Sequence, residues 1–369
     1  MSLGLTLDEI DTPALVLDLN AFDKNLDAMA SHTAASGISL RPHAKAHKSP
    51  WIASQQVERG AVGLCCQKVS EAATFIDAGA ESIVITNEIV EISKIRRMTQ
   101  LALRADVSFC IDSADGLEMY DGLAAESGAT LGVFVDLQGG WYRPGATSTE
   151  QVLDLAKRVA PFDKLRFCGL QAYNAIAQHI ADFDLRLAAT VEFCHRVNEA
   201  IDALNQAGLE SFASGAGTGT YDIDPLHAPF NEIQPGSYVF MDGGYLENMN
   251  ADGDARTDFE VSLYVLTTVM SCPAPGVAIV DSGTKTVSIG QGMPLVYLPN
   301  GEKANIEFLK AADEHGTIDV ERHEVSVGDR LLLVPYNVDP TVNLFDEYLG
   351  LRDGVVTTVI PVSGRGKSQ

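Results

Sequence analysis

The 369-residue chain is poor in basic residues, because 26 Lys and Arg stand against 50 Asp and Glu, which gives a net charge of −24. A surface this acidic repels phosphate backbones and anionic lipids, so we expect neither nucleic acid nor a membrane as a partner. No run of about 18 uninterrupted apolar residues occurs, and the acidic start MSLGLTLDEI lacks the basic segment of a secretion signal. These absences predict a cytoplasmic protein.

Cysteine is also scarce, and its spacing matches neither a zinc site nor a disulfide framework. The six cysteines all lie in apolar surroundings: Cys65, Cys66, Cys110, Cys168, Cys194 and Cys272. This pattern predicts reduced, buried thiols, as in a cytoplasmic protein. Apolar residues make up 46% of the chain, which is enough for a substantial core and excludes a mainly disordered state.

The first two thirds of the chain alternate between short apolar runs and longer segments of helical periodicity. The apolar runs lie at residues 38–41, 61–65, 81–86, 107–111, 131–136, 165–171, 210–214 and 231–235. Alternation of this kind is typical of parallel βα units. Eight units predict an α/β fold with a TIM-type (β/α)8 barrel.

The pattern changes near residue 250, where turn residues separate apolar runs and no long helical segment remains. These later runs lie at residues 259–273, 276–283, 285–290, 293–299, 329–335 and 355–362. They predict a C-terminal β domain. We assign residues 20–250 to the barrel, and residues 251–369 to the β domain together with the N-terminal strand of residues 1–19. The run at 12–19 could pair with either domain.

The active site of such a barrel lies on the loops that follow the carboxyl ends of the strands. Polar residues stand at these positions: His43, Lys45, Gln67, Arg143, Tyr173 and His179. The seventh strand opens into Gly217-Thr218-Gly219-Thr220, where barrels often bind phosphate through backbone N–H groups, although a flexible turn would look the same. A lysine that faces a phosphate site across the barrel mouth indicates pyridoxal phosphate, held as a Schiff base.

The segment Arg41-Pro42-His43-Ala44-Lys45-Ala46-His47-Lys48 closely resembles the lysine motif of the D-threonine aldolase and D-serine dehydratase family. These pyridoxal-phosphate enzymes have the alanine-racemase-like fold, in which a barrel precedes a β domain. The resemblance continues in the same order at Asp11-Thr12-Pro13-Ala14, Gly217-Thr218-Gly219-Thr220-Tyr221, Gly236-Ser237-Tyr238-Val239-Phe240-Met241-Asp242 and Asp339-Pro340-Thr341-Val342-Asn343-Leu344. It therefore covers nearly the whole chain.

The resemblance implies roles for individual residues. Lys45 would hold the cofactor, and residues 217–220 would bind its phosphate. Arg143 matches an arginine near the ring oxygen, although its local sequence departs from the usual one. Tyr173 and His179 would lie near the substrate's β-hydroxyl as catalytic residues. Their positions after the first, second and eighth strands make His43, Gln67 and Tyr238 further expected cofactor contacts.

One motif departs from the family pattern, which has a histidine two residues before an aspartate or cysteine, the pair binding a divalent metal. Here Asn337 stands in the place of the histidine before Asp339. Two oxygen ligands suit Mg²⁺ or Mn²⁺ better than Zn²⁺. We therefore expect either a weakly held hard cation, which we favour, or no metal.

The resemblance implies a homodimeric lyase that acts on a small amino-acid substrate. We expect retro-aldol cleavage of a D-β-hydroxy-α-amino acid, of the D-threonine or 3-hydroxy-D-aspartate type, to glycine and an aldehyde or oxo acid. His179 would remove the β-hydroxyl proton directly or through a water molecule. The alternatives are β-elimination with Lys45 as the base, racemisation, a non-catalytic protein that binds the cofactor, and a barrel that uses Lys45 without this cofactor.

Overall fold

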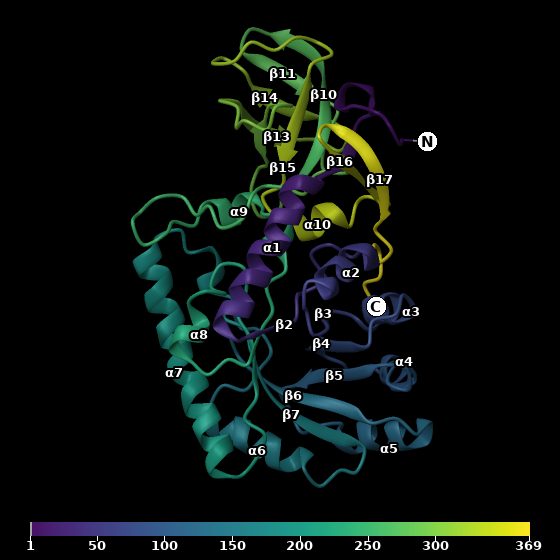
Figure 1. The fold of residues 1–369 in the computed structure, drawn as a ribbon, viewed down its shortest axis with the longest axis vertical. Coiled ribbons are helices and arrows are strands. Elements are labelled where there is room, and N and C mark those ends of the chain that lie inside the picture. Colours follow the sequence, from purple (N-terminus) through teal and green to yellow (C-terminus); the bar gives the residue numbers. More distant parts are fainter. Residues whose placement is uncertain (1) are drawn as a thin grey trace.

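The computed structural model describes residues 2–369 and contains two β-sheets, one in each half of the molecule (Figure 1). The first sheet has eight parallel strands: β2 Ser39–Leu40, β3 Leu64–Cys66, β4 Ser82–Glu88, β5 Asp106–Ile111, β6 Leu131–Leu137, β7 Leu165–Ala172, β8 Ala213–Gly215 and β9 Glu232–Ile233. Each strand overlaps one of the eight apolar runs of the sequence. The barrel prediction is thus confirmed.

Backbone hydrogen bonds close this sheet into a ring. The strand order is β2-β9-β8-β7-β6-β5-β4-β3. Beyond the two end strands, the Ala44 N–H donates to the Cys65 carbonyl at 2.8 Å, and the Cys65 N–H donates to the Pro42 carbonyl at 2.9 Å. Closure brings the carboxyl ends of all eight strands to one rim, where the loop that carries Lys45 begins.

Helices cover the outside of the ring, where their apolar faces pack against the strands. They are α2 Pro50–Glu58, α3 Val69–Asp77, α4 Ile92–Leu101, α5 Leu117–Ser127, α6 Thr149–Val159, α7 Phe183–Gln206 and the short α8 Asp224–His227. Helix α6 shows how the sequence sets such bounds, because the Ser148 hydroxyl accepts from the Gln151 N–H at its start. Lys157 and Arg158 complement the helix dipole at its end.

The second sheet is built mainly from the last third of the chain. Its strands are β1 Ala14–Asp18, β10 Leu263–Ala274, β11 Val277–Val280, β12 Leu295–Tyr297, β13 Glu307–Ala311, β14 Gly316–Asp319, β15 Arg330–Val334, β16 Glu347–Arg352 and β17 Val355–Pro361. Strand β1 pairs antiparallel with β10 and parallel with β16, so the N-terminal strand lies in this sheet. The division at residues 20 and 250 stays a prediction.

Part of the predicted second sheet is wrong in detail. Residues 285–290 form turns rather than a strand, with the Val287 side chain buried in the core. Strands β13, β14 and β16 and the helix α10 Val338–Val342 were not predicted from the sequence. Strand β13 buries only Phe308 fully, so its sequence shows little of the apolar alternation that marks a strand.

The cysteines and the helices bear on two predictions made from composition. The six cysteines are free thiols, and five of them are buried as expected. Cys272 lies exposed near the end of β10, so the prediction of burial is wrong there. Along residues 2–369, no helix has the length and apolar character needed to cross a bilayer.

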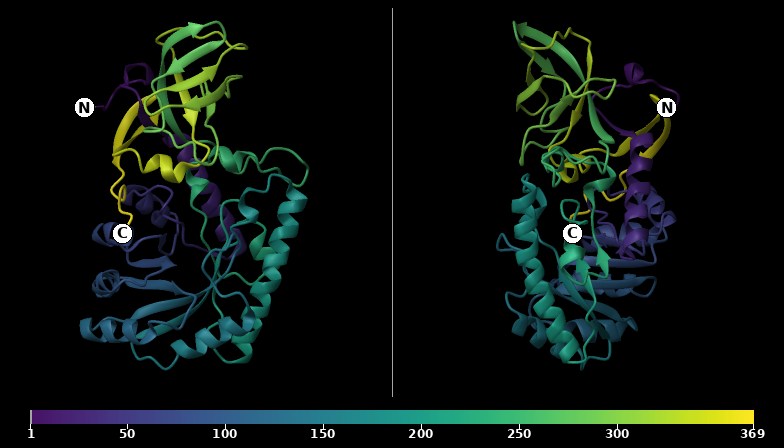
Figure 2. Two further views of the ribbon diagram at one scale, coloured as in Figure 1. Left: turned by 180° about the vertical axis from the view of Figure 1, so that it is seen from behind. Right: turned by 60° about the vertical axis from the view of Figure 1, so that its left-hand side comes forward.

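The second sheet meets the barrel at the rim that carries the strand ends. Helix α1 Leu19–Ser36 runs from strand β1 down along the barrel, with α10 beside it (Figure 2). The Tyr348 hydroxyl of β16 donates to the His47 carbonyl in the loop after β2. The Gly243 N–H, beyond the last barrel strand, donates to the Pro335 carbonyl at 2.9 Å. Residues from both halves therefore surround the barrel mouth.

Asn25 of α1 fastens this helix to the chain that joins the two halves. Its buried amide donates to the carbonyls of Val239, at 3.2 Å, and Glu260, at 2.7 Å, and accepts from the Glu260 N–H at 2.7 Å. Asn25→Leu keeps the branched shape, although it is larger, and leaves these groups unpaired, so the free energy of unfolding should fall by about 1–3 kcal/mol in urea titrations. The exposed control Asn300→Ala should change it by less than about 0.5 kcal/mol. Equal values for the two variants would contradict this assignment.

Candidate active site

A cavity of about 200 Å³ opens at the carboxyl ends of the barrel strands. Among the predicted site residues, it is lined by His43, Lys45, Gln67, Arg143, Tyr173, Gly217 and Thr218. A second hollow, of about 520 Å³, shares Lys45, Arg143 and Tyr173 and is also lined by His179, Asn337 and Asp339. Loops after several different strands thus meet segment 335–339 from the other half of the molecule.

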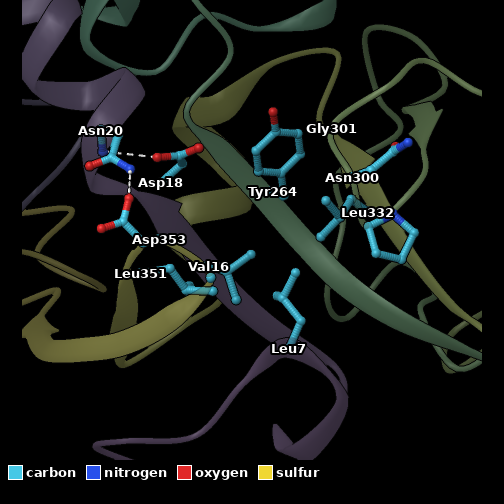
Figure 3. A pocket seen from close by; sticks show the side chains of 12 residues that line it. Leu7, Val16, Asp18, Asn20, Tyr264, Asn300, Gly301, Leu332, Leu351 and Asp353 are labelled. Atoms are coloured by element: carbon cyan, nitrogen blue, oxygen red, sulfur yellow. Dashed lines mark hydrogen bonds between the residues drawn. The ribbon is translucent and has the colours of Figure 1, made fainter.

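Another hollow, of about 240 Å³, lies away from the barrel mouth, against the second sheet (Figure 3). Val16, Tyr264 and Leu351 form an apolar surface there. Its polar groups already serve the fold, since the Asp18 carboxylate caps α1 and Asn20 donates to Asp353 at 2.9 Å. This hollow contains none of the residues predicted to act in chemistry.

Lys45 stands where the two cavities of the barrel mouth meet. Its ammonium group forms an ion pair with the Asp339 carboxylate. Burial alone would lower the pKa of Lys45, but Asp339 and Tyr173 together raise this pKa above its ordinary value. Lys45 is therefore charged and paired when no ligand is bound, and it must give up a proton before it can act as a nucleophile.

The inner cavity has the features of a phosphate site. The Thr218 hydroxyl is buried and has no hydrogen-bond partner along the described chain, residues 2–369. Gly236 also lines the cavity, and a Cβ there would lie 2.9 Å from the His43 carbonyl oxygen, so the loop that carries Lys45 packs directly against it. A buried hydroxyl without a partner indicates that a ligand normally supplies one. The residues present therefore fit the phosphate of pyridoxal phosphate beside Lys45.

Three predicted cofactor contacts do not lie at this cavity. The Tyr238 side chain is buried in the core, where its ring centroid lies 5.6 Å from that of Phe259. Its hydroxyl accepts a hydrogen bond from the Gln56 side-chain nitrogen at 3.2 Å. Thr220 is fully buried and donates to Asp224. Gly219 is not among the lining residues, since its N–H donates to the Gln178 side chain at 3.0 Å. Gly217 and Thr218 are the part of the glycine-rich loop that reaches the cavity.

Around the outer hollow lie an uncharged imidazole and two phenols. His179 packs against the Tyr245 ring with centroids 4.4 Å apart. Burial lowers the pKa of His179, and a hydrogen bond with the Gly244 backbone opposes this only in part. Burial also raises the pKa of Tyr173, whose ring carries the Arg143 guanidinium 5.5 Å from its centroid. His179 can therefore accept a proton at neutral pH, while the phenols remain donors.

Several lining residues were missed by the sequence analysis. Gln171 and Gln234 exchange two hydrogen bonds, of 2.9 and 2.8 Å, in the barrel interior. Gln171 was detectable, because it is a polar residue within a strand that is otherwise apolar towards its end. Asp242 caps the short helix α9 Gly243–Leu246, and burial raises its pKa to about 7. Nothing in its local sequence indicated a position beside Asp339.

The Asn337 and Asp339 pair does not fit a divalent cation in this arrangement. The Asn337 amide oxygen accepts from the Asp339 N–H at 3.0 Å as the N-cap of α10, and its nitrogen donates to Gln291. Asp339 pairs with Lys45, which leaves one carboxylate oxygen without a partner. Across residues 2–369, no three His, Cys, Asp or Glu side chains are grouped as metal ligands. The donor set is thus one carboxylate and an amide already used in capping.

Comparison with known proteins agrees with this architecture. Residues 17–243 match the family described as alanine racemase, N-terminal domain, and residues 262–351 match the "Putative serine dehydratase domain" family. The chain is 40% identical to the 3-hydroxy-D-aspartate aldolase of Paracoccus denitrificans (strain Pd 1222), over 99% of this chain and 94% of that protein. It is 39% identical to the D-threonine aldolase of Arthrobacter sp., over 99% of this chain and 96% of that protein.

A solved structure extends the likeness to three dimensions. The crystal structure of D-threonine aldolase from Filomicrobium marinum matches with a TM-score of 0.94 at 39% identity, covering 100% of this chain and 99% of that one. Sequence and structure thus agree over both halves of the molecule. The chain belongs to the alanine-racemase-like family that includes the D-threonine and 3-hydroxy-D-aspartate aldolases.

Proposed function

We propose that the protein is a pyridoxal-phosphate-dependent lyase that cleaves a D-β-hydroxy-α-amino acid into glycine and an aldehyde or oxo acid. The substrate would be of the D-threonine or 3-hydroxy-D-aspartate type, as the names of the two relatives suggest. One observation carries the proposal: Lys45 stands between a buried, unpaired Thr218 hydroxyl and an uncharged His179, in adjoining cavities. This arrangement separates a cofactor end from a proton-transfer end.

Pyridoxal phosphate, when bound, supplies an electron sink for the bond that breaks at the substrate's Cα. Lys45 would hold it, and the Thr218 hydroxyl with the backbone near Gly217 and Gly236 would bind its phosphate. Because Asp339 pairs with the Lys45 ammonium group in the free protein, use of Lys45 as a neutral amine frees the Asp339 carboxylate. That carboxylate then faces the outer hollow as an acceptor.

His179 would remove the proton of the substrate's β-hydroxyl, and the hydroxyl oxygen becomes a carbonyl oxygen as the Cα–Cβ bond breaks. The lowered pKa of His179 keeps the imidazole free to accept that proton. β-Elimination instead requires the hydroxyl to leave, a step that a Lewis acid normally assists. The donors at Asn337 and Asp339 do not form such a site, so the geometry favours proton removal.

We also propose that the protein is a cytoplasmic homodimer. The acidic composition and the buried free thiols support the location. The family resemblance supports the dimer. Sedimentation velocity of the purified protein tests this directly, because a single species at the monomer mass would contradict it.

The Lys45→Ala variant should lose the visible absorbance band of the bound cofactor and all turnover, because no other amine in the cavity can replace it. The fold should survive, since the Lys45 side chain is 42% exposed. Absorbance spectra before and after borohydride treatment check this, with circular dichroism as the control for folding. An adduct that borohydride still reduces in the variant would assign the anchor to another lysine, such as Lys68.

The Thr218→Val variant should weaken cofactor binding by about tenfold or more, the effect of losing one hydrogen bond to a charged group. Titration of the cofactor-free protein with pyridoxal phosphate measures the dissociation constant. Thr218→Ser keeps the hydroxyl and serves as the matched control, with binding near that of the native protein. Unchanged affinity in Thr218→Val would show that this hydroxyl does not bind the phosphate.

The His179→Ala variant should lower kcat by about 10²–10⁴-fold, the usual contribution of a general base. In the native protein, kcat should hold as the pH falls to about 6.5 and decline only below it, because the pKa of His179 lies under its ordinary value. Chelation should leave turnover unchanged. Loss of turnover on chelation, or full activity of His179→Ala, would contradict proton removal by this imidazole.

A further inference from the structure

Gln178 is a buried residue that joins the glycine-rich loop to the turn that carries His179. Its side chain is 1% exposed, and it precedes His179 in the short helix Ala177–His179. Its amide oxygen accepts from the Gly219 N–H at 3.0 Å, and its amide nitrogen donates to the Thr220 hydroxyl at 2.9 Å and the Asn174 carbonyl at 3.0 Å. One amide hydrogen therefore bonds the glycine-rich loop, and the other bonds the segment that precedes His179.

Gly217 and Gly219 both lie where a larger side chain would collide with Gln178. A Cβ on Gly217 would lie 2.3 Å from the Gln178 side-chain oxygen, and a Cβ on Gly219 would lie 2.2 Å from the Gln178 carbonyl oxygen. Neither glycine has a positive φ, so backbone conformation does not require them. The glycine pattern here makes room for Gln178, whereas Thr218 between them keeps its hydroxyl free for a ligand.

Both ends of this contact are fixed by further buried groups. On the loop side, Thr220 donates to Asp224 at the start of α8. On the other side, the fully buried Arg186 of α7 donates to the carbonyls of Ile180, at 2.6 Å, and Ala181, at 3.1 Å, directly after His179. Gln178 is thus a polar bridge between two anchored segments.

We propose that Gln178 is a positioning residue that couples occupancy of the phosphate loop to the placement of His179, an inference that rests on the proposed function. A phosphate that binds the Thr218 hydroxyl orders residues 217–220. Through its bonds to Gly219 and Thr220, Gln178 then holds the adjacent His179 in the orientation needed for the β-hydroxyl proton. Arg186 and Gln178 already hold this turn in the free protein, and binding of the cofactor would rigidify it further through the same bonds.

Hydrogen–deuterium exchange followed by mass spectrometry tests the coupling without measuring turnover. In the native protein, loading with pyridoxal phosphate should slow exchange by about tenfold at residues 216–220 and also at residues 176–182. Gln178→Met fills a similar space without the amide. The protection gained on loading should be lost at residues 176–182 but kept in the loop, except at Gly219, whose N–H loses its acceptor. The control Asn25→Leu removes a buried amide that bonds neither the loop nor residues 176–182. Its overall stability is lower, but the protection gained on loading should match that of the native protein at both segments.

A second measurement separates positioning from a merely structural role. At saturating cofactor, Gln178→Met should lower kcat by about tenfold and change KM by less than about twofold, because the base is misplaced while substrate binding is kept. If this variant does not fold, Thr220→Val removes one of the bonds instead, and the same exchange pattern decides.

Two results would overturn the coupling: protection that spreads to residues 176–182 in the Gln178 or Thr220 variant, or protection that stops at the loop in the native protein. Failure of the proposed function is recognised separately. In that case the native protein does not bind pyridoxal phosphate, or binds it and releases no glycine from a D-β-hydroxy amino acid. The exchange experiment needs only bound pyridoxal phosphate, so it can be interpreted even if no glycine is released.

Discussion

Closure of the eight-stranded ring is the constraint on which the site depends. Parallel strands in a closed barrel must end on the same rim, and the backbone bonds between residues 42–44 and Cys65 complete that rim. The loop after β2 is thereby held beside the loops after β7 and β8, although more than 120 residues separate Lys45 from Tyr173 along the chain. The C-terminal half then covers the rim and contributes Asp339 from helix α10, so neither half alone contains the whole site.

The barrel was predictable from the sequence because its strands are buried on both sides and read as short apolar runs. The second sheet was less predictable from the sequence, because β13 exposes most of its side chains and is held in the sheet by its pairing with β14. The predicted site residues were found by their position after strand ends, which sets location but not side-chain direction. Tyr238 shows this limit, because it follows the last barrel strand yet points into the core.

Asn337, which stands where the resembling family pattern has a histidine, shows how one residue alters the chemistry available. An asparagine that precedes a helix is a strong N-cap, and here the Asn337 oxygen is used in that way. The amide oxygen is therefore bound to the backbone of Asp339 itself, and the two residues act as parts of one helix start. In the proposed function, chemistry at the β-hydroxyl would fall to the protein's own groups, with His179 as the base and Asp339 as a nearby carboxylate. That carboxylate pairs with Lys45 in the free protein.

Product analysis tests this account most directly. The protein loaded with pyridoxal phosphate is incubated with D-threonine and with 3-hydroxy-D-aspartate, and the products are followed by proton NMR. Retro-aldol cleavage predicts one glycine for each substrate molecule consumed, together with the matching aldehyde or oxo acid, and no reaction with Lys45→Ala. Release of ammonia with an oxo acid that keeps the whole carbon chain, or inversion at Cα without cleavage, would contradict it.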